Sequence, residues 1–168
     1  MQKLQTAVGR WTVLAALSLG VLSALACSRE RDSSLIGTFR MGEKVQAGPV
    51  TYEVLESSWR TALSDGGRIP SDRFLFLRVI IANSAAEAVS VPGFSLVGPD
   101  QKTYREITEN MQNVSKWLGL FRNLQPGQSL EGWVVFDAPM GAYKLVVSDA
   151  GDIGAEKYAH IDIPVHLE

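Results

Sequence analysis

The residues of this sequence that could bind a metal ion lie near its C-terminal end. His160, Asp162 and His166 alternate with apolar residues, so they share one face of a predicted strand. A histidine and an aspartate two residues apart can turn toward one zinc ion. His166 lies too far along the strand to share that ion with His160, at about 3.3 Å per residue. Because antiparallel sheets often carry polar rows on a solvated face, we favour that interpretation over a metal site.

An acidic loop precedes that strand. Asp149, Asp152 and Glu156 lie close together in the sequence, and clustered oxygens suit a hard cation such as calcium. Their spacing does not match the EF-hand loop. The sequence around Asp149 also favours an Asx-type turn, in which the carboxylate accepts a backbone N–H. We therefore expect a turn here, and the sequence predicts no bound metal and no cofactor.

The familiar catalytic patterns are absent from the sequence. It has no Gly-x-Ser-x-Gly elbow, no Walker loop, no Cys-x-x-Cys pair and no dinucleotide fingerprint. Neither histidine has a paired acid and serine in its sequence context. We therefore predict that the chain is not an enzyme.

Large apolar residues and an arginine gather in the segment Lys116 to Arg122. Aromatic residues and arginine dominate the hot spots of protein interfaces. We therefore take Trp117, Phe121 and Arg122 as candidate contacts with a protein partner, and expect Trp117 to be at least partly exposed. Packing in the core would explain Leu118 and Phe121 equally well.

The first 26 residues have the composition of an export signal. Two cations, Lys3 and Arg10, and no acid precede an uncharged run from residue 11 to residue 26 that ends in small residues. This run is shorter than the roughly 20 residues that span a bilayer as a helix, which disfavours an uncleaved anchor. Residues 1–26 are thus predicted to be a signal peptide that takes the chain out of the cytoplasm.

Cys27 follows this leader directly and is the only cysteine of the chain. The tetrapeptide Ala24-Leu25-Ala26-Cys27 resembles the lipobox of bacterial lipoproteins, whose cysteine is diacylated and becomes the mature N-terminus. Those proteins usually have leucine where Ala24 stands, and the same residues also suit an ordinary signal peptidase, which would release a soluble protein. We favour lipidation, because a lone cysteine in an exported protein has no disulfide partner. The acyl chains would then anchor the protein to a membrane.

Composition and charge limit the other possibilities. A length of 168 residues suits one domain, and 46% apolar with 20% charged residues is ordinary for a globular protein. The net charge is −2, and removal of the two leader cations leaves 14 basic against 18 acidic residues, a net charge of −4. A nucleic-acid binder needs a basic stripe against the phosphates, so no nucleic-acid partner is expected.

The body of the chain alternates short β-rich runs with clusters of Gly, Pro, Asn and Asp, which is typical of a β-sandwich. The run from Phe74 to Ala82 is apolar at nearly every position, which predicts a central strand with both faces covered. The turn Gln125-Pro126-Gly127 suits type II geometry. Further strands are expected at residues 50–59, 88–91, 94–97, 102–107, 128–136, 143–147 and 158–167.

One segment, residues 110–122, interrupts this β pattern. Met111, Val114, Leu118 and Phe121 recur near helical spacing, which predicts a short helix or an inserted loop that plugs an open end of the sandwich. The expected organisation is a signal peptide (1–26), a lipidated cysteine with a flexible tether (27–41) and an all-β, immunoglobulin-like antiparallel sandwich (42–168).

Six short sequence motifs follow one another along the chain, and their order is characteristic. They are FLFLRVIIAN from residue 74, VSV from 89, FSLV from 94, LQPGQS from 124, GWVVFD from 132 and LVVSD from 145. In this order they resemble a bacterial immunoglobulin-like family, a domain of unknown function numbered four-three-five-two. The resemblance covers roughly residues 42–165. It implies a β-sandwich behind a lipoprotein leader in the bacterial cell envelope, and it brings no catalytic residues.

Together these features predict a non-enzymatic lipoprotein of the cell envelope that acts as a protein-binding or scaffolding module. Its partners would be a membrane, through the N-terminal lipid, and another envelope protein. The alternative is an envelope protein that binds a small ligand or a calcium or zinc ion through the acidic loop or the histidines of the last strand.

Overall fold

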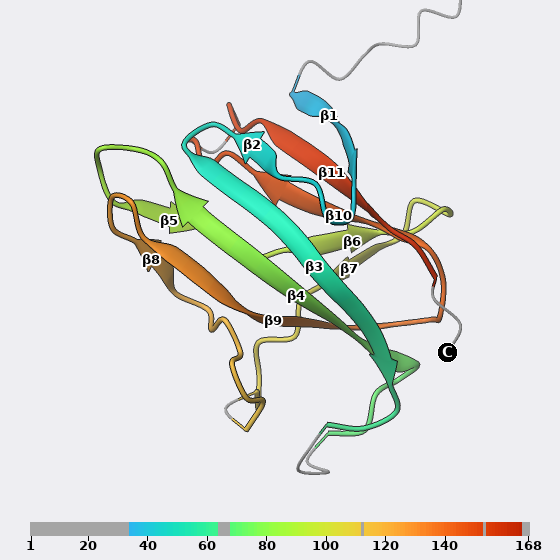
Figure 1. Ribbon diagram of the computed structural model, residues 1–168. Coiled ribbons are helices and arrows are strands. Elements are labelled where there is room, and N and C mark those ends of the chain that lie inside the picture. The colour runs from blue at the N-terminus through green and yellow to red at the C-terminus, as the bar shows by residue number, and fades with distance from the viewer. Residues whose placement is uncertain (1–33, 64–67, 112, 153, 166–168) are drawn as a thin grey trace, which may run out of the picture. The chain divides into compact units, whose positions relative to one another are not determined.

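The apolar run after residue 73 forms a central strand of a four-stranded sheet. The computed structural model describes residues 34–63, 68–111, 113–152 and 154–165. In this sheet β4 (Arg73–Asn83) pairs antiparallel with β3 (Val50–Arg60) on one side and with β9 (Ser129–Ala138) on the other. The short β2 (Val45–Ala47) pairs with the outer edge of β3 (Figure 1). The order is therefore β2-β3-β4-β9.

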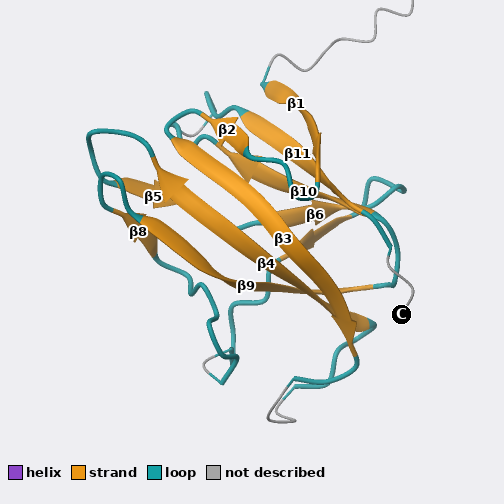
Figure 2. Ribbon diagram, in the orientation of Figure 1, coloured by secondary structure: helices purple, strands orange, loops and turns teal. Residues whose placement is uncertain are grey.

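A five-stranded sheet of order β1-β11-β10-β6-β7 forms the second layer. Its pairs are antiparallel except for β1 with β11, which run parallel. A two-stranded ladder of β5 and β8 completes the body, and Figure 2 shows only strands and loops in the described part of the chain. The strand bounds are β1 Leu35–Arg40, β5 Val89–Val91, β6 Ser95–Val97, β7 Thr103–Arg105, β8 Arg122–Leu124, β10 Tyr143–Ser148 and β11 Tyr158–Ile163.

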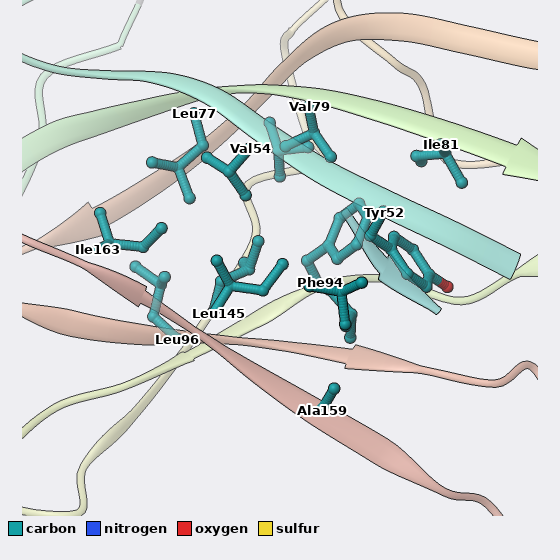
Figure 3. Packing of buried hydrophobic residues seen from close by; sticks show 14 of the residues in the cluster. Tyr52, Val54, Leu77, Val79, Ile81, Phe94, Leu96, Leu145, Ala159 and Ile163 are labelled. Carbon is teal, nitrogen blue, oxygen red and sulfur yellow. The ribbon is translucent and has the colours of Figure 1, made fainter. Parts of the chain in front are cut away.

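The main core lies between the two sheets. Val54 and Leu77 of the four-stranded sheet face Leu96, Leu145 and Ile163 of the five-stranded sheet, and all five are fully buried or nearly so (Figure 3). Each such side chain stabilises the folded state by about 1.5–3 kcal/mol relative to leaving it in water. Period-two burial thus produces two packed sheets, and the predicted all-β sandwich is confirmed.

The first half of β4 is buried on both faces, as expected for this strand. Leu75 and Leu77 pack in the main core, whereas Phe74 and Phe76 point away from it. The phenylalanines belong to a second cluster on the outer face of the four-stranded sheet. Its buried members are Leu63, Phe74, Phe76, Ile107, Met111, Val114 and Val135.

The segment between β7 and β8 is an irregular loop, so the loop alternative is right and the helix alternative is wrong. Asn110, Lys116 and Gly119 have φ values of 57°, 57° and 73°. These values are incompatible with a right-handed helix. Met111 and Val114 are buried because they cover the second cluster, not because they repeat along a helix. The described residues include no helix long and apolar enough to cross a membrane.

This loop closes the free edge of β9. The Ile107 N–H donates to the Val135 carbonyl at 2.7 Å, and the Leu118 N–H donates to the Trp133 carbonyl at 3.1 Å. In return the Trp133 N–H donates to the Lys116 carbonyl at 2.8 Å. An unpaired strand edge is a template for aggregation. The insert therefore plugs a sheet edge, where the sequence predicted an open end of the sandwich.

The folded body begins earlier than predicted. The sequence predicts a flexible tether up to residue 41, but Leu35–Arg40 form β1, which pairs with β11 from Leu35 opposite Tyr158 to Arg40 opposite Asp162. Phe39 of β1 packs against the main core, and this burial stabilises the pairing of β1 with β11. The boundary at residue 41 is therefore wrong. The signal peptide, Cys27 and residues 28–33 lie outside the described residues.

The predicted turn after β8 is present. The Gln128 N–H donates to the Gln125 carbonyl at 2.9 Å, and Gly127 at the third turn position has a φ of 72°. Only glycine adopts that conformation without steric cost, which fits the type II geometry. The last strand ends at Ile163, earlier than expected, and His166 and Leu167 lie outside the described residues.

Candidate functional site

Arg122 is the largest fully buried side chain of the fold, with an exposed fraction of 1%. Its Nη2 donates to both carboxylate oxygens of Glu106, at 2.9 and 2.8 Å, and its Nη1 donates to the Pro92 carbonyl at 3.2 Å. The guanidinium carbon lies 4.7 Å from the centre of the Phe94 ring. One buried cation thus holds three segments of chain together: residues 92–94, residue 106 and β8.

Strand alternation brings this pair inside. In β8 Arg122 and Leu124 face inward while Asn123 faces solvent, and Arg122 lies opposite Val91 of β5. Glu106 follows β7, and its N–H donates to the Phe94 carbonyl at 3.2 Å. A buried charge is tolerated when it is paired and hydrogen-bonded, and the contacts of Nη1 and Nη2 pair this charge, whereas the buried Nε has no hydrogen-bond partner among the described residues.

Phe121 precedes the buried arginine directly and is 96% exposed. Leu120 beside it is 48% exposed. Single exposed apolar residues are ordinary on protein surfaces, but two adjacent ones that include an almost fully exposed phenylalanine form a candidate contact patch. The backbone next to the patch is held in place, because Arg122, which follows Phe121, is fixed by its ion pair with Glu106.

The other predicted contacts lie elsewhere. Trp117 is half-buried, as expected, and packs with Trp133 against the second cluster. The ring of Trp133 lies 6.0 Å from that of Phe76 in an edge-on arrangement. Arg122 as a partner contact is wrong, because a side chain that is 1% exposed cannot reach a partner's surface. Only Phe121 of the three is presented openly to solvent.

A hollow of about 380 Å³ adjoins the exposed patch. Its wall includes Leu120 of the patch and Glu106 of the buried pair, so the three features form one site. The remaining lining residues are Gly93, Phe94, Ser95, Arg105 and Thr108.

His160 and Asp162 lie on the outer face of β11, as the alternation predicted. Together with Lys144 of β10 they line a second hollow of about 340 Å³. The His160 ring lies 5.5 Å from that of Tyr158. Among the described residues, no three His, Cys, Asp or Glu side chains are grouped closely enough to hold a metal ion.

The acidic loop is built around an Asx turn, as predicted. Asp149 Oδ1 accepts the Gly151 N–H at 3.0 Å and the Lys157 N–H at 3.1 Å. The Asp152 carbonyl accepts the Ala155 N–H at 2.9 Å. The carboxylate of Asp149 therefore organises the loop by accepting backbone N–H groups.

Glu106 was missed from the sequence. It lies 16 residues from Arg122, and nothing in its neighbourhood marks it as buried. A signal did exist at Arg122, because the residue alternates with Leu124 immediately before a Pro-Gly turn and therefore shares the inward face of a short strand. That signal indicates burial, and a buried arginine implies an acidic partner without identifying it.

Several solved structures are similar to this chain. The YjhA protein from Bacillus subtilis is 18% identical with a TM-score of 0.55, and the match covers 74% of this chain and 99% of that one. The candidate lipoprotein YcdA from Bacillus subtilis is 16% identical with a TM-score of 0.57, and the match covers 73% of this chain but only 38% of that one. The secreted protein MPT63 from Mycobacterium tuberculosis is 12% identical with a TM-score of 0.55, over 75% of this chain and 96% of that one. These likenesses show a shared fold.

No curated protein matches the chain. A family described as a domain of unknown function, DUF4352, matches residues 39–158. The matched range runs from the end of β1 to the start of β11, and it contains every phrase on which the sequence resemblance rested. The resemblance is therefore confirmed, and the chain belongs to the DUF4352 family.

Proposed function

We propose that this protein is a non-enzymatic, exported lipoprotein that binds another protein of the cell envelope. Export and lipidation are supported by the leader of residues 1–26 and by Cys27 directly after it. Similar folds occur in a candidate lipoprotein and in a secreted protein, which agrees with an exported role.

The observation that carries the binding role is the exposure of Phe121, at 96%, on a support fixed by the buried Glu106–Arg122 pair. Burial of a phenylalanine side chain by a partner stabilises a complex by about 1.5–3 kcal/mol. The contacts of Arg122 fix the backbone next to Phe121, so less backbone freedom is lost on binding, which favours affinity further. Hot spots of interfaces are enriched in such anchors.

The chemistry near this patch supports binding over catalysis. Both carboxylate oxygens of Glu106 accept hydrogen bonds from Arg122, so this acid is occupied as a structural partner. A general acid or base must be within reach of a substrate proton. Glu106 has an exposed side-chain fraction of only 6%, which leaves it little access to one.

The anchor is tested by mass spectrometry of the mature protein from its native membrane. A diacylated cysteine at position 27 is the expected N-terminal residue, and Cys27→Ser should abolish the modification and move the protein out of the membrane fraction. A mature chain that begins with an unmodified cysteine would contradict lipid anchoring.

The binding role is tested by a photoreactive phenylalanine analogue placed at position 121 in the living bacterium. Ile69 is the matched control position, because it is also a large apolar residue and is 90% exposed. We expect a discrete adduct with an envelope protein from position 121 and none of that mass from position 69. Equal labelling from both positions would mean that the patch is not a specific contact.

A further inference from the structure

The hollow beside Leu120 contains one charged side chain, Arg105, that forms no ion pair within the described structure. Arg105 of β7 lines it and is exposed, and its side chain forms no hydrogen bond or ion pair with any described residue. The other charged group of the wall, Glu106, is neutralised by its bidentate contact with Arg122. The hollow therefore has a net positive charge.

Two residues with hydroxyl groups, Ser95 and Thr108, line the same hollow as Arg105. Ser95 lies directly opposite Arg105 in the antiparallel pair of β6 and β7, so their side chains share the outer face of the sheet. Residues directly opposite on one face have Cβ atoms about 4.5–5.5 Å apart. Thr108 adds a second hydroxyl to the same wall. Arginine presents N–H donors in a planar fork that fits a carboxylate, and hydroxyls can donate to the same oxygens.

The rest of the wall is apolar. Phe94 forms part of it, and Leu120 joins it to the exposed Phe121. Gly93 also lines the hollow, and a Cβ there would stand 3.2 Å from Glu106 Oε1, so a small residue keeps this space open above the ion pair. The volume of about 380 Å³ falls within the range of roughly 300–1,000 Å³ that small-molecule sites occupy.

An adjoining hollow of about 270 Å³ shares Arg105, Glu106 and Thr108 with the first. It adds the charged groups Arg68, Glu109 and Asp137. Asp137 already accepts the N–H groups of residues 71 and 72, at 2.8 and 3.0 Å. Arg68 and Glu109 have opposite charges that offset each other. The Asp137 carboxylate keeps its charge but is held by the backbone of residues 71 and 72, so Arg105 stays without an ion pair and is the anchor for an anion.

We propose that this hollow binds a carboxylate that lies next to an apolar side chain, as found at the C-terminus of a protein chain or at an acidic residue within a hydrophobic segment. The carboxylate sits on Arg105 with the hydroxyls of Ser95 and Thr108, and the apolar group packs against Leu120 and Phe121. This inference rests on the proposed function, since it gives the partner its recognised chemistry.

The test uses the mature full-length protein in detergent and small probes followed by amide chemical-shift changes. N-acetyl-leucine carries both groups, N-acetyl-leucinamide lacks the carboxylate, and acetate lacks the apolar group. A peptide with an internal Leu-Asp pair and an amidated end distinguishes an acidic side chain from a terminal carboxylate. We expect saturable shifts at the backbone amides of Ser95, Arg105 and Thr108 with N-acetyl-leucine or the Leu-Asp peptide, and at least tenfold weaker binding of the amide and of acetate.

Two variants make the result decisive. Arg105→Gln removes the charge from an exposed side chain and should weaken N-acetyl-leucine and the Leu-Asp peptide at least tenfold. Lys144→Gln removes an exposed cation from the outer face of the same sheet, two strands away, and should change nothing. Binding that is equal for acid and amide, or unchanged by Arg105→Gln, would overturn the proposal.

The adduct experiment at position 121 separates this inference from the proposed function. If the adduct forms in the Arg105→Gln strain as in the wild type and the probes show no carboxylate preference, the binding role stands and the carboxylate site falls. If the probes bind as expected but no adduct forms, the carboxylate site stands and the binding role falls.

Discussion

Phe121 and Arg122 are consecutive residues with opposite environments: the first is 96% exposed and the second 1% exposed. Arg122 is the first residue of β8 and points inward, whereas Phe121 directly before the strand points to solvent. We therefore expect a change to the buried ion pair to shift the exposed aromatic ring through their shared backbone, although the two side chains do not share a surface.

The buried pair should respond very differently to one substitution and to two. Glu106→Leu is expected to lower the free energy of unfolding by about 3–5 kcal/mol, because it leaves Arg122 as an unpaired buried charge. Adding Arg122→Met should recover most of that loss, since an apolar pair needs no hydrogen bonds. Urea unfolding measures both.

Arg78, whose side chain is 38% exposed, is the control. It pairs with Glu56 at 3.2 Å and with Glu131 at 3.4 Å, and these side chains are 38–48% exposed. Exposed ion pairs contribute about 0–1 kcal/mol, so Arg78→Gln should cost no more than that. A double variant as unstable as Glu106→Leu alone would contradict our account of the buried pair.

Trp117 and Phe121 should separate into a packing residue and a surface residue. Trp117→Ala is expected to lower the free energy of unfolding by about 2 kcal/mol, because the half-buried ring covers the second cluster. Phe121→Ser should change it by less than about 0.5 kcal/mol, as surface substitutions usually do. Thermal unfolding of the two variants decides the matter, and a large loss with Phe121→Ser would mean that the ring packs in solution.

Gly132 should be essential for the loop that covers β9. A Cβ at this position would overlap the Lys116 carbonyl oxygen and lie 3.0 Å from Leu118 Cδ2. Gly132→Ala is expected to cost about 1–3 kcal/mol through this crowding and to speed hydrogen exchange of the Leu118 and Trp133 amides. At Gly141 the nearest atom would be 3.6 Å away, so Gly141→Ala should cost less than about 0.5 kcal/mol and leave those amides protected.

Stability should fall at high pH. Burial raises the pKa of Tyr143 from 10.0 to about 12, and the neighbouring Tyr104 raises it further. The folded state therefore keeps a proton that the unfolded state loses, so the stabilisation is complete below pH 10 and is lost as the pH rises toward 12. Tyr52 acts in the same direction, because burial raises its pKa too.

Tyr143→Phe isolates the first of these two groups. Its hydroxyl also donates to the Pro139 carbonyl at 2.6 Å, so the variant should be less stable at pH 8. Between pH 10 and pH 12 it should lose less stability than the wild type, since it has no phenol to ionise. An identical decline in both proteins would show that Tyr143 does not titrate in this range.

Burial with a period of two was the part of the fold that sequence could predict. β4 and β3 were located within about two residues because Val, Ile and Phe alternate or run continuously there. β1 was missed because Leu35–Arg40 contains glycine and polar residues, and its attachment depends on one partly buried residue, Phe39. The formation of such an edge strand depends on the strand it pairs with, here β11, which lies far away in the sequence.

The segment from Met111 to Phe121 misled in a different way. Apolar residues there recur near helical spacing, but Met111 and Val114 cover the outer face of β4 while Phe121 points to solvent. The φ values at Asn110 and Lys116 are positive, so the backbone is not a continuous helix there. The site could be located to this segment from composition, but the pairing of Glu106 with Arg122 required the tertiary structure.

The pairing of β1 with β11 limits the length of chain between the sandwich and Cys27. Because β1 begins at Leu35, the residues between the sheet and Cys27 are Ser28 to Ser34, and seven residues span less than about 30 Å even at full extension. A lipid on Cys27 would keep the sandwich close to its own bilayer, so its partner must come to that membrane or already reside there.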